Sequence, residues 1–356
     1  IKSKKSVSEE NGITIIRTFG NKTKTSNKIM RLYAEQTMSH KILKYNQNFI
    51  KSTKCDFLIV YSPSIFWVKL IKKIKLQNNC KSYLILRDLF PQWLVDTGII
   101  SKNGLLDKYF SFKEAQLYNH CDVIGVQSPK NLNHFNSKIS LKNKYNLEVL
   151  YNWIKINTND KIKKRNDFRE KNNLRNKTIF VYAGNLGFAQ DMPNILRLAN
   201  NTKKIENIHF LLIGDGTEKQ KIKKSIIEMK LNNITLLPSV GEKRLIEILT
   251  QCDVGLISLS KKLKTENIPG KLLSYCQAGL PTLASINKSE DLKKIIIESN
   301  CGMICENGDD KNFYDNVLTL FNSPEMINTY GGNTNSLLKK YFDVHSASKQ
   351  ILSQYK

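Results

Sequence analysis

Residues 265–281 combine a glutamate, a helix start and a lysine in a spacing that could hold an anionic ligand. The segment reads TENIPGKLLSYCQAGLP, and Pro269 is favoured near the first turn of a helix. Lys271 then falls in that first turn, where a cation opposes the helix dipole unless an anion balances it. Three more lysines precede the helix, namely Lys261, Lys262 and Lys264. The pattern favours an anion site over a solvated lysine on an ordinary helix. Glu266, in the loop before the helix, offers a carboxylate to ligand hydroxyls.

Two glycine turns follow predicted strands in the same half of the chain. The first is Gly184-Asn185-Leu186-Gly187, and the second is Gly214-Asp215-Gly216. Glycine lets a backbone approach a ligand closely, and free helix amides attract anions. Each turn alone could equally be structural. In one parallel sheet the two turns would share an edge, and together they favour a phosphate-bearing ligand.

The elements that would position these residues alternate between strand and helix from residue 12 onward. Short β-branched runs predict strands at residues 13–19, 57–60, 83–86, 123–126, 148–151, 178–182, 208–213, 234–237, 254–257, 281–284 and 302–305. Amphipathic helical segments separate them. Near-continuous apolar strands of this kind belong to parallel sheets that are covered on both faces. The sequence therefore predicts an α/β fold with two doubly wound, Rossmann-like domains facing a cleft.

A polar, charged segment at residues 153–177 interrupts this alternation and predicts a linker. Residues 1–152 then form the first domain and residues 178–341 the second. Residues 342–356 are expected to form a helix that packs back on the first domain.

Composition narrows the class of protein. The chain has 356 residues and a net charge of +25, and 40% of its residues are hydrophobic, which suits two domains with real cores. No apolar run reaches the roughly 18 residues needed to span a membrane. The seven cysteines lack a framework spacing, so we expect free thiols in a reducing compartment.

Residues 266–281 resemble the donor-site signature of family 4 glycosyltransferases with the GT-B fold. In that family a Glu is followed by a second Glu and by a small-residue helix that ends in Gly-x-Pro. Four other segments are similar to bacterial cell-surface polysaccharide enzymes of the N-acetylfucosamine-transferase type, known as WbuB-like. They read LRDLFPQWLVDTGII (86–100), SPKNLNHF (128–135), LYNW (150–153) and GNLGFAQDMPNILRLA (184–199).

This resemblance implies a retaining, metal-independent hexosyltransferase that uses no cofactor. It would move a sugar, an N-acetylated deoxyhexosamine in that subgroup, from a UDP-linked donor to a lipid-diphosphate-linked or saccharide acceptor in O-antigen or capsule synthesis. The first domain would bind the acceptor and the second the nucleotide sugar. Such enzymes work in the cytoplasm, at the cytoplasmic face of the inner membrane. Family members begin with a strand and a glycine loop before the strand matched by residues 13–19, so we expect the first domain to lack its first strand.

The resemblance also assigns residues. Glu266 matches the first motif Glu, which contacts hydroxyls of the donor sugar. The second Glu, which holds the ribose, falls on Ser274, and a serine reaches less far and carries no charge. Asn185 and Gln190 replace an Arg and a Lys that hold the diphosphate in many relatives, so Lys271 or the lysines before it would do so here. The implied donor contacts are Gly184, Asn185, Gly187, Gly214, Gly216, Lys262, Lys264, Pro269, Gly270, Lys271 and Ser274.

Asp88 ends a predicted strand of the first domain, where related enzymes carry a His-Asp pair and this chain has Arg87 before the Asp. We interpret Asp88 as an acceptor contact and a candidate general base, alongside Glu266. A helix cap before Pro91 explains the same aspartate equally well. None of the five histidines stands in a metal-ligand pattern with Cys or carboxylates, so no metal site is expected.

Residues 64–76 alternate an apolar helical face with lysines 69, 72, 73 and 75. A helix lying on an anionic membrane has this pattern, and so does a helix packed on its own sheet with a solvated basic face. The resemblance tips the interpretation toward the membrane.

Two other classes of function stay open. A nucleotide-sugar epimerase of the same fold would share the nucleotide site and need no acceptor. A nucleic-acid-binding protein would explain the net charge, but the sequence has neither a local basic stripe nor aromatics beside arginines. We rank transferase first and expect no nucleic-acid partner.

Overall fold

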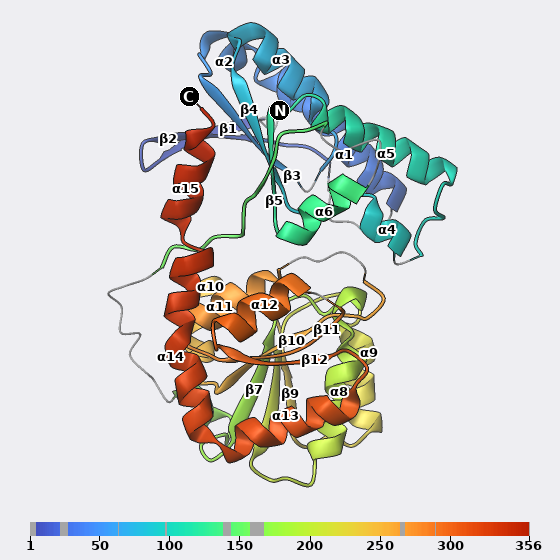
Figure 1. Ribbon diagram of the computed structural model, residues 1–356. Coiled ribbons are helices and arrows are strands. Elements are labelled where there is room, and N and C mark those ends of the chain that lie inside the picture. Colours follow the sequence, from blue (N-terminus) through green and yellow to red (C-terminus); the bar gives the residue numbers. More distant parts are fainter. Residues whose placement is uncertain are drawn as a thin grey trace. The chain divides into compact units, whose positions relative to one another are not determined.

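The computed structural model describes residues 5–21, 28–62, 64–96, 98–137, 144–156, 167–263, 268–288 and 290–355. The chain divides into two compact units (Figure 1). Unit 1 comprises Ile1–Gln127, Asn131–Leu150 and Gln350–Lys356, and unit 2 comprises Ser128–Lys130 and Tyr151–Lys349. Each unit has its own sheet and its own core, so each is described separately.

Unit 2 is built on a sheet of six parallel strands. They are β7 (Thr178–Ala183), β8 (Ile208–Ile213), β9 (Ile234–Leu237), β10 (Val254–Ser258), β11 (Thr282–Ile286) and β12 (Gly302–Glu306). Their order is β12-β11-β10-β7-β8-β9, so the order reverses between β7 and β10. Open α/β sheets bind ligands beyond the carboxyl ends of the strands at this reversal. The doubly wound arrangement predicted for this half of the chain is confirmed.

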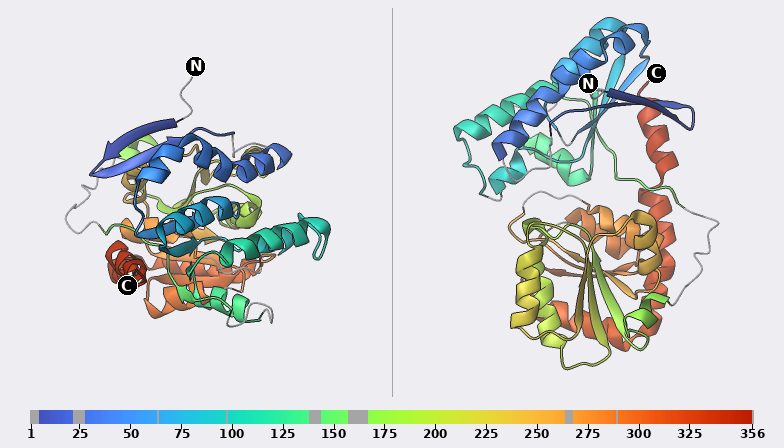
Figure 2. Two further views of the ribbon diagram at one scale, coloured as in Figure 1. Left: turned by 90° about the horizontal axis from the view of Figure 1, so that it is seen from above. Right: turned by 180° about the vertical axis from the view of Figure 1, so that it is seen from behind.

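Helices cover both faces of this sheet, as Figure 2 shows. One face packs against α8 (Met192–Thr202), α9 (Lys219–Glu228) and α13 (Asp310–Asn322). The other packs against α7 (Asp167–Lys171), α10 (Glu242–Leu249), α11 (Gly270–Gln277), α12 (Glu290–Glu298) and α14 (Pro324–Tyr341). In β7 the side chains of Phe180 and Tyr182 enter the first core, while Ile179 and Val181 enter the second. Two buried faces explain why these strands are apolar throughout.

Part of the predicted linker belongs to the fold of unit 2. Helix α7 lies inside residues 153–177, and its Phe168 is buried in the core. Arg169 donates hydrogen bonds to the carbonyl oxygens of Gln251 (2.6 Å) and Lys177 (2.9 Å), and it pairs with the Asp253 carboxylate at 2.6 Å. The polar composition of the segment gave no indication of this short helix. The expected linker is therefore too long at its C-terminal end.

Unit 1 contains a parallel four-stranded sheet in the order β3-β4-β5-β6. The strands are β3 (Phe57–Ser62), β4 (Lys81–Leu86), β5 (Val123–Val126) and β6 (Leu147–Val149). The helices before and between them are α1 (Lys28–Tyr45), α2 (Gln47–Ser52), α3 (Val68–Asn78), α4 (Gln92–Asp96), α5 (Leu105–Tyr118) and α6 (Pro129–Ser137). Side chains of α3, α5 and α6 pack on one face of the sheet.

The other face of this sheet receives the end of the chain. In α15 (Val344–Ser353), Gln350 donates to the Val149 carbonyl at 2.8 Å, and Gln354 just beyond the helix donates to Glu148 at 2.9 Å. The Tyr355 ring meets Phe57 edge-on. Residues separated by about 200 positions therefore close one surface of unit 1.

The prediction that residues 13–19 join the parallel sheet is wrong. Strand β2 (Ile13–Thr18) instead pairs antiparallel with β1 (Lys5–Glu10) in a separate two-stranded sheet. The turn between them is Asn11-Gly12, and both residues have positive φ, as a type I′ turn requires. A two-residue turn can join only antiparallel neighbours, whereas a parallel strand needs a long crossover. The Asn-Gly pair was the signal in the sequence.

The apolar face of residues 64–76 packs inside unit 1. Ile71 is buried, and Phe66 and Trp67 pack against the same core. Lys75 leaves the basic face and pairs with the Asp122 carboxylate at 2.5 Å. The simpler interpretation of this helix is therefore correct for its apolar side, and that side does not lie on a membrane. No helix in the described residues is both long and apolar enough to cross a bilayer.

Replacing Arg169 with Ala should lower the free energy of unfolding of unit 2 by about 2 kcal/mol, because two buried carbonyls and a carboxylate lose their donor. Urea unfolding measures the change. Arg175→Ala is the matched control, since Arg175 is 71% exposed and pairs only with Glu170 at the surface. Equal stability of the two variants would show that α7 is not anchored.

Candidate functional site

A buried tyrosine fixes helix α11 at the point where the strand order of unit 2 reverses. The Tyr275 hydroxyl accepts the Ala183 amide of β7 at 2.9 Å and donates to the Leu256 carbonyl of β10 at 3.0 Å. Its ring lies where a side chain on Gly255 would stand, because a Cβ there would come within 2.4 Å of the ring. Tyr275 thus bridges the two strands at the reversal and holds α11 across them.

Lys271 lies one helical turn before Tyr275 and therefore on the same side of α11. Its Nζ donates to the Tyr182 hydroxyl at 3.0 Å and lies 4.2 Å from the centre of that ring. Loss of hydration lowers the pKa of Lys271 to about 7. No carboxylate of the described residues forms an ion pair with this ammonium. The site holds a desolvated cation whose partners are a hydroxyl and the face of an aromatic ring.

The first glycine turn lies directly beside this cation. Gly184 has a φ of +146°, a conformation that L side chains rarely adopt, and a Cβ there would be 3.3 Å from Lys271 Cε. The Tyr182 hydroxyl also donates to the Asn185 carbonyl at 2.7 Å. The turn after β7 and the amino end of α11 are therefore in contact at the carboxyl edge of the sheet.

The second glycine turn supports the first by direct backbone contact. A Cβ on Gly214 would lie 1.9 Å from the Gly184 carbonyl oxygen, and one on Gly216 would lie 2.3 Å from the Leu186 carbonyl oxygen. The Leu186 amide donates to the Asp215 carbonyl at 2.9 Å. Gly214 and Gly216 are thus explained by packing, which is the structural alternative. The two turns do share one edge of the sheet.

The neighbouring turn residues are tied to each other. Asp215 accepts hydrogen bonds from the Ser239 amide (2.9 Å) and hydroxyl, and it pairs with Lys219. These donors hold the pKa of Asp215 below its usual range. Asn185 donates to Gln190 at 3.3 Å, and Gly187 packs against Asn185. Neither amide side chain supplies the positive charge that a diphosphate would need.

The lysines before α11 do not gather around Lys271 in the described residues. Lys262 Nζ lies 5.6 Å from the centre of the Phe188 ring, in the 3₁₀ turn that follows the first glycine turn. Lys261 Nζ instead approaches Gly308, and its charge lowers the pKa of Asp310. Lys264 and Glu266 lie outside the described residues. Of the predicted cations, Lys271 lies against the first glycine turn, and Lys262 lies against the 3₁₀ turn that follows it.

The other predicted donor contacts lie on α11 itself. Pro269 precedes the helix with an extended backbone, and Gly270 begins it with open space where a side chain would be. Ser274 is half-buried and three residues after Lys271, so the two share a side of the helix. The first amides of a helix have no partner within it. This helix start therefore offers donors next to the ammonium.

Asp88 belongs to unit 1, just beyond the carboxyl end of β4. Desolvation of its carboxyl by the surrounding protein raises the pKa of Asp88, and the adjacent Arg87 lowers it. Arg87 itself is buried and donates to the Leu150 carbonyl at 3.1 Å. The position at a strand end suits a ligand contact. Asp88 is the one predicted catalytic residue that the structure describes.

The sequence analysis did not identify the two tyrosines that position α11 and contact Lys271. Tyr182 and Tyr275 read as ordinary apolar positions of a strand and a helix. A signal was present, since Gly255 in the middle of a buried strand indicates close approach of another group. The group was not identifiable without the fold.

Residues 163–336 match the family model described as Glycosyl transferases group 1. The protein named "Probable glycosyltransferase WbjE" of Pseudomonas aeruginosa is 28% identical over 240 residues, covering 64% of this chain and 57% of that protein. This chain therefore spans little more than half the length of that relative.

Solved structures show the same fold. HepE of Anabaena, crystallised in complex with UDP and glucose, is 13% identical and aligns with a TM-score of 0.69, covering 88% of this chain and 80% of that one. WaaG, a glycosyltransferase involved in lipopolysaccharide biosynthesis, aligns with a TM-score of 0.67 at 12% identity, covering 93% and 84%. The predicted GT-B fold is confirmed.

Stability of the ligand-free protein should rise between pH 7 and pH 10 through Lys271. The folded state holds this lysine at a pKa of about 7, against 10.5 normally, so the unfolded chain binds more protons in that window. Lys271→Met should remove this contribution and flatten the rise, as urea unfolding at pH 7, 8.5 and 10 would show. Lys221→Met, at an exposed position on α9, is the control. Parallel pH profiles for all three proteins would mean that Lys271 is hydrated.

Proposed function

We propose that this chain, whose residues 163–336 match the family model of the group 1 glycosyl transferases, transfers a sugar from a UDP-linked donor to a lipid-diphosphate-linked or saccharide acceptor. The observation that carries the proposal is the Lys271 side chain, which lies against Tyr182 and the Gly184 turn at the carboxyl edge of a doubly wound sheet. An anion of matching size would relieve the cost of keeping this charge away from water. A diphosphate leaving group is such an anion.

The donor side of the reaction follows from this geometry. Lys271 and the start of α11 would stabilise the charge that builds on the diphosphate as the bond to the sugar breaks. Gly184 would let the backbone approach the phosphates, and Ser274 would contact the ribose. Glu266 would contact hydroxyls of the donor sugar. Binding of UDP and glucose by HepE, which has the same fold, supports a UDP-linked donor.

The acceptor side would rest on Asp88, with its raised pKa, as a contact or general base for the attacking hydroxyl. Retention of anomeric configuration and independence from metal and cofactor are parts of the proposal that rest on the family resemblance. Three further parts of the proposal rest on the same resemblance. The transferred sugar is an N-acetylated deoxyhexosamine, the pathway is O-antigen or capsule synthesis, and the enzyme works in the cytoplasm at an anionic inner-membrane surface. The role of WaaG in lipopolysaccharide biosynthesis supports a surface-polysaccharide pathway.

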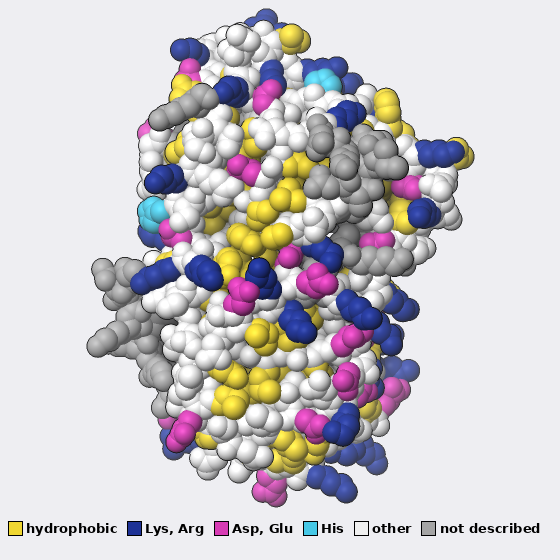
Figure 3. All heavy atoms as spheres, viewed as in Figure 1, with side chains coloured by type: hydrophobic (Ala, Val, Ile, Leu, Met, Phe, Trp, Pro, Cys, Tyr) yellow, Lys and Arg dark blue, Asp and Glu magenta, His cyan; other side chains and the backbone are white. Residues whose placement is uncertain are grey.

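The other classes of function are not favoured. The relatives described above are named as glycosyltransferases, which argues against an epimerase. On the face shown in Figure 3, Lys and Arg side chains are scattered among Asp and Glu side chains and form no stripe. The face shown therefore gives no support to a nucleic-acid-binding surface.

UDP should raise the thermal midpoint of the purified chain, because a ligand that binds the native state stabilises it. GDP and ADP should raise the midpoint less. Lys271→Met should weaken UDP binding by roughly tenfold or more, since a charge-assisted contact is lost. Lys221→Met is the control for loss of one surface charge. No shift with any nucleotide would contradict the donor assignment, and an equal shift with all three would remove the preference for uridine.

The affinity for UDP should also fall as pH rises above 7, because the ammonium must be charged to meet the diphosphate. Calorimetric titration in buffers of different ionisation enthalpy would show uptake of a proton above pH 7. Lys271→Met should lack this uptake.

Asp88→Asn should lower kcat by about 10²–10⁴ if the carboxylate is a general base, while leaving UDP affinity unchanged, because Lys271 and the donor contacts belong to unit 2. The assay measures transfer from UDP-sugars to lipid-diphosphate saccharides. Asp107→Asn, in the first turn of α5, is the control. Full activity of Asp88→Asn would leave Asp88 as a helix cap.

A further inference from the structure

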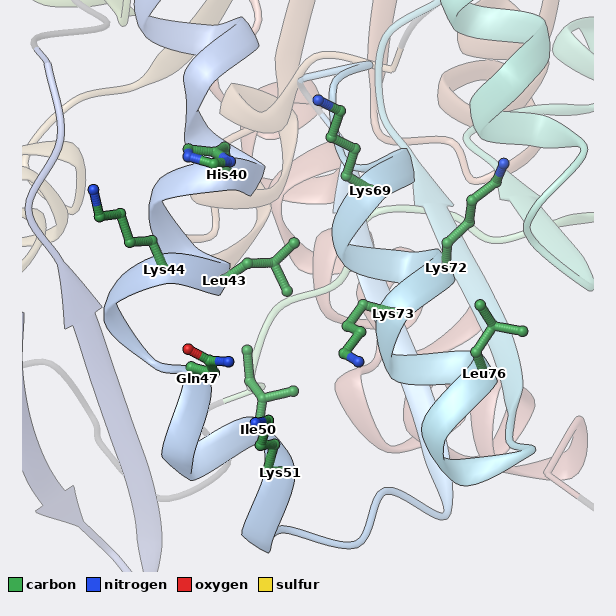
Figure 4. A pocket seen from close by; sticks show the side chains of 10 residues that line it. All are labelled: His40, Leu43, Lys44, Gln47, Ile50, Lys51, Lys69, Lys72, Lys73 and Leu76. Atoms are coloured by element: carbon green, nitrogen blue, oxygen red, sulfur yellow. The ribbon is translucent and has the colours of Figure 1, made fainter.

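A groove on unit 1 runs between the helix pair α1–α2 and helix α3, with a volume of about 550 Å³ (Figure 4). Six basic side chains line it, and these are His40, Lys44, Lys51, Lys69, Lys72 and Lys73. All six are exposed. No acidic side chain is among the lining residues. Three helices thus contribute to one concentration of positive charge that none of them would produce alone.

The five groove lysines differ from three other basic residues of the same unit in having no acidic partner among the described residues. Arg31 pairs with Glu35, Lys54 with Asp56 and Lys75 with Asp122. In the described part of the chain no ion pair involves any of the six groove residues. Their charge is therefore available to a bound anion.

The groove also has an apolar component. Leu43 and Ile50 lie between the lysines, and Leu76 at the end of α3 is 85% exposed. Figure 4 shows Leu43 and Ile50 on the side of α1–α2 that faces α3. None of the lining residues is Phe, Tyr or Trp, so the imidazole of His40 is the one ring among them on which a base could stack. Cations surrounding aliphatic side chains fit a ligand that carries both a phosphate and a hydrocarbon chain.

The walls of the groove are tied together, so the site exists before any ligand binds. The Gln77 side chain of α3 donates to the carbonyls of Ile50 (2.6 Å) and Lys51 (3.2 Å) on α2. Ser39 of α1 donates to the Phe66 carbonyl just before α3. These bonds bridge the two sides at both ends.

We infer that this groove binds the phosphate headgroup of an anionic phospholipid and so docks unit 1 on a membrane surface. The inference rests on the membrane part of the proposed function and locates it. The contact uses the outer faces of α1, α2 and α3 and not the apolar face of α3, which is buried in the core. The lysines bind phosphates, and Leu76 meets the acyl region.

Sedimentation with vesicles tests the inference. The full chain should bind vesicles of phosphatidylcholine with one quarter phosphatidylglycerol, and bind pure phosphatidylcholine weakly. The triple variant Lys69→Gln, Lys72→Gln and Lys73→Gln should bind the anionic vesicles about 100-fold more weakly, at roughly fivefold per lysine. The matched control replaces Lys221, Lys223 and Lys224, three exposed lysines on α9 of unit 2, with Gln. It removes the same charge and should bind like the unaltered chain.

Further measurements distinguish a lipid phosphate from free phosphate as the ligand, and membrane binding by unit 1 from nucleotide binding by unit 2. Leu76→Ser should weaken vesicle binding several-fold without changing charge, and inorganic phosphate at 5 mM should not compete if the ligand is a lipid. Equal loss in the groove variant and the α9 control would overturn the inference, and so would full competition by inorganic phosphate. The thermal shift with UDP should be the same in the groove variant, so that failure of this inference and failure of the donor site are distinguishable.

Discussion

The placement of α11 by Tyr275 is the interaction on which the candidate site depends. One hydroxyl bonds to both β7 and β10, and these are the two strands between which the order of the sheet reverses. Because Lys271 is four residues earlier on the same helix, this bond also decides where its ammonium lies. The cation is kept beside Tyr182 and the Gly184 turn, where water is scarce. Because an anion bound at this place would restore the proton and the charge of the lysine, the free protein is prepared for an anion.

The glycines around the site divide into two kinds. Gly184 has a conformation that other residues rarely adopt and lies against the lysine, so it shapes the volume that a ligand would occupy. Gly214 and Gly216 are small because the backbone of the first turn passes within contact distance of them. A motif of the form Gly-x-Gly thus contributes here by supporting another turn. This distinction explains why such motifs are weak indicators of ligand binding when they are read alone.

Lysines of the same helix in unit 1 have different surroundings. Lys75 points back to the sheet and bonds to Asp122, whereas its neighbours Lys72 and Lys73 face a groove without acidic residues. Their spacing along α3 does not predict which lysine has an acidic partner, because the partner depends on the elements that pack on either side of the helix. Arg87 likewise is buried and donates to the Leu150 carbonyl, directly after the end of β4.

The sequence by itself determined the alternation of strands and helices, the doubly wound arrangement of unit 2 and the resemblance of the segment around Lys271 to a glycosyltransferase motif, because these depend on local periodicity and on residue types at fixed spacing. It also contained the Asn11-Gly12 hairpin, whose turn chemistry is local and was overlooked. Tertiary structure alone decided the burial of Lys271, the support of one glycine turn by the other, the anchoring of α7 through Arg169 and the meeting of α1, α2 and α3 around the groove. Each of these joins residues from separate elements, and the free energy of a charge depends on which of those elements exclude water from it.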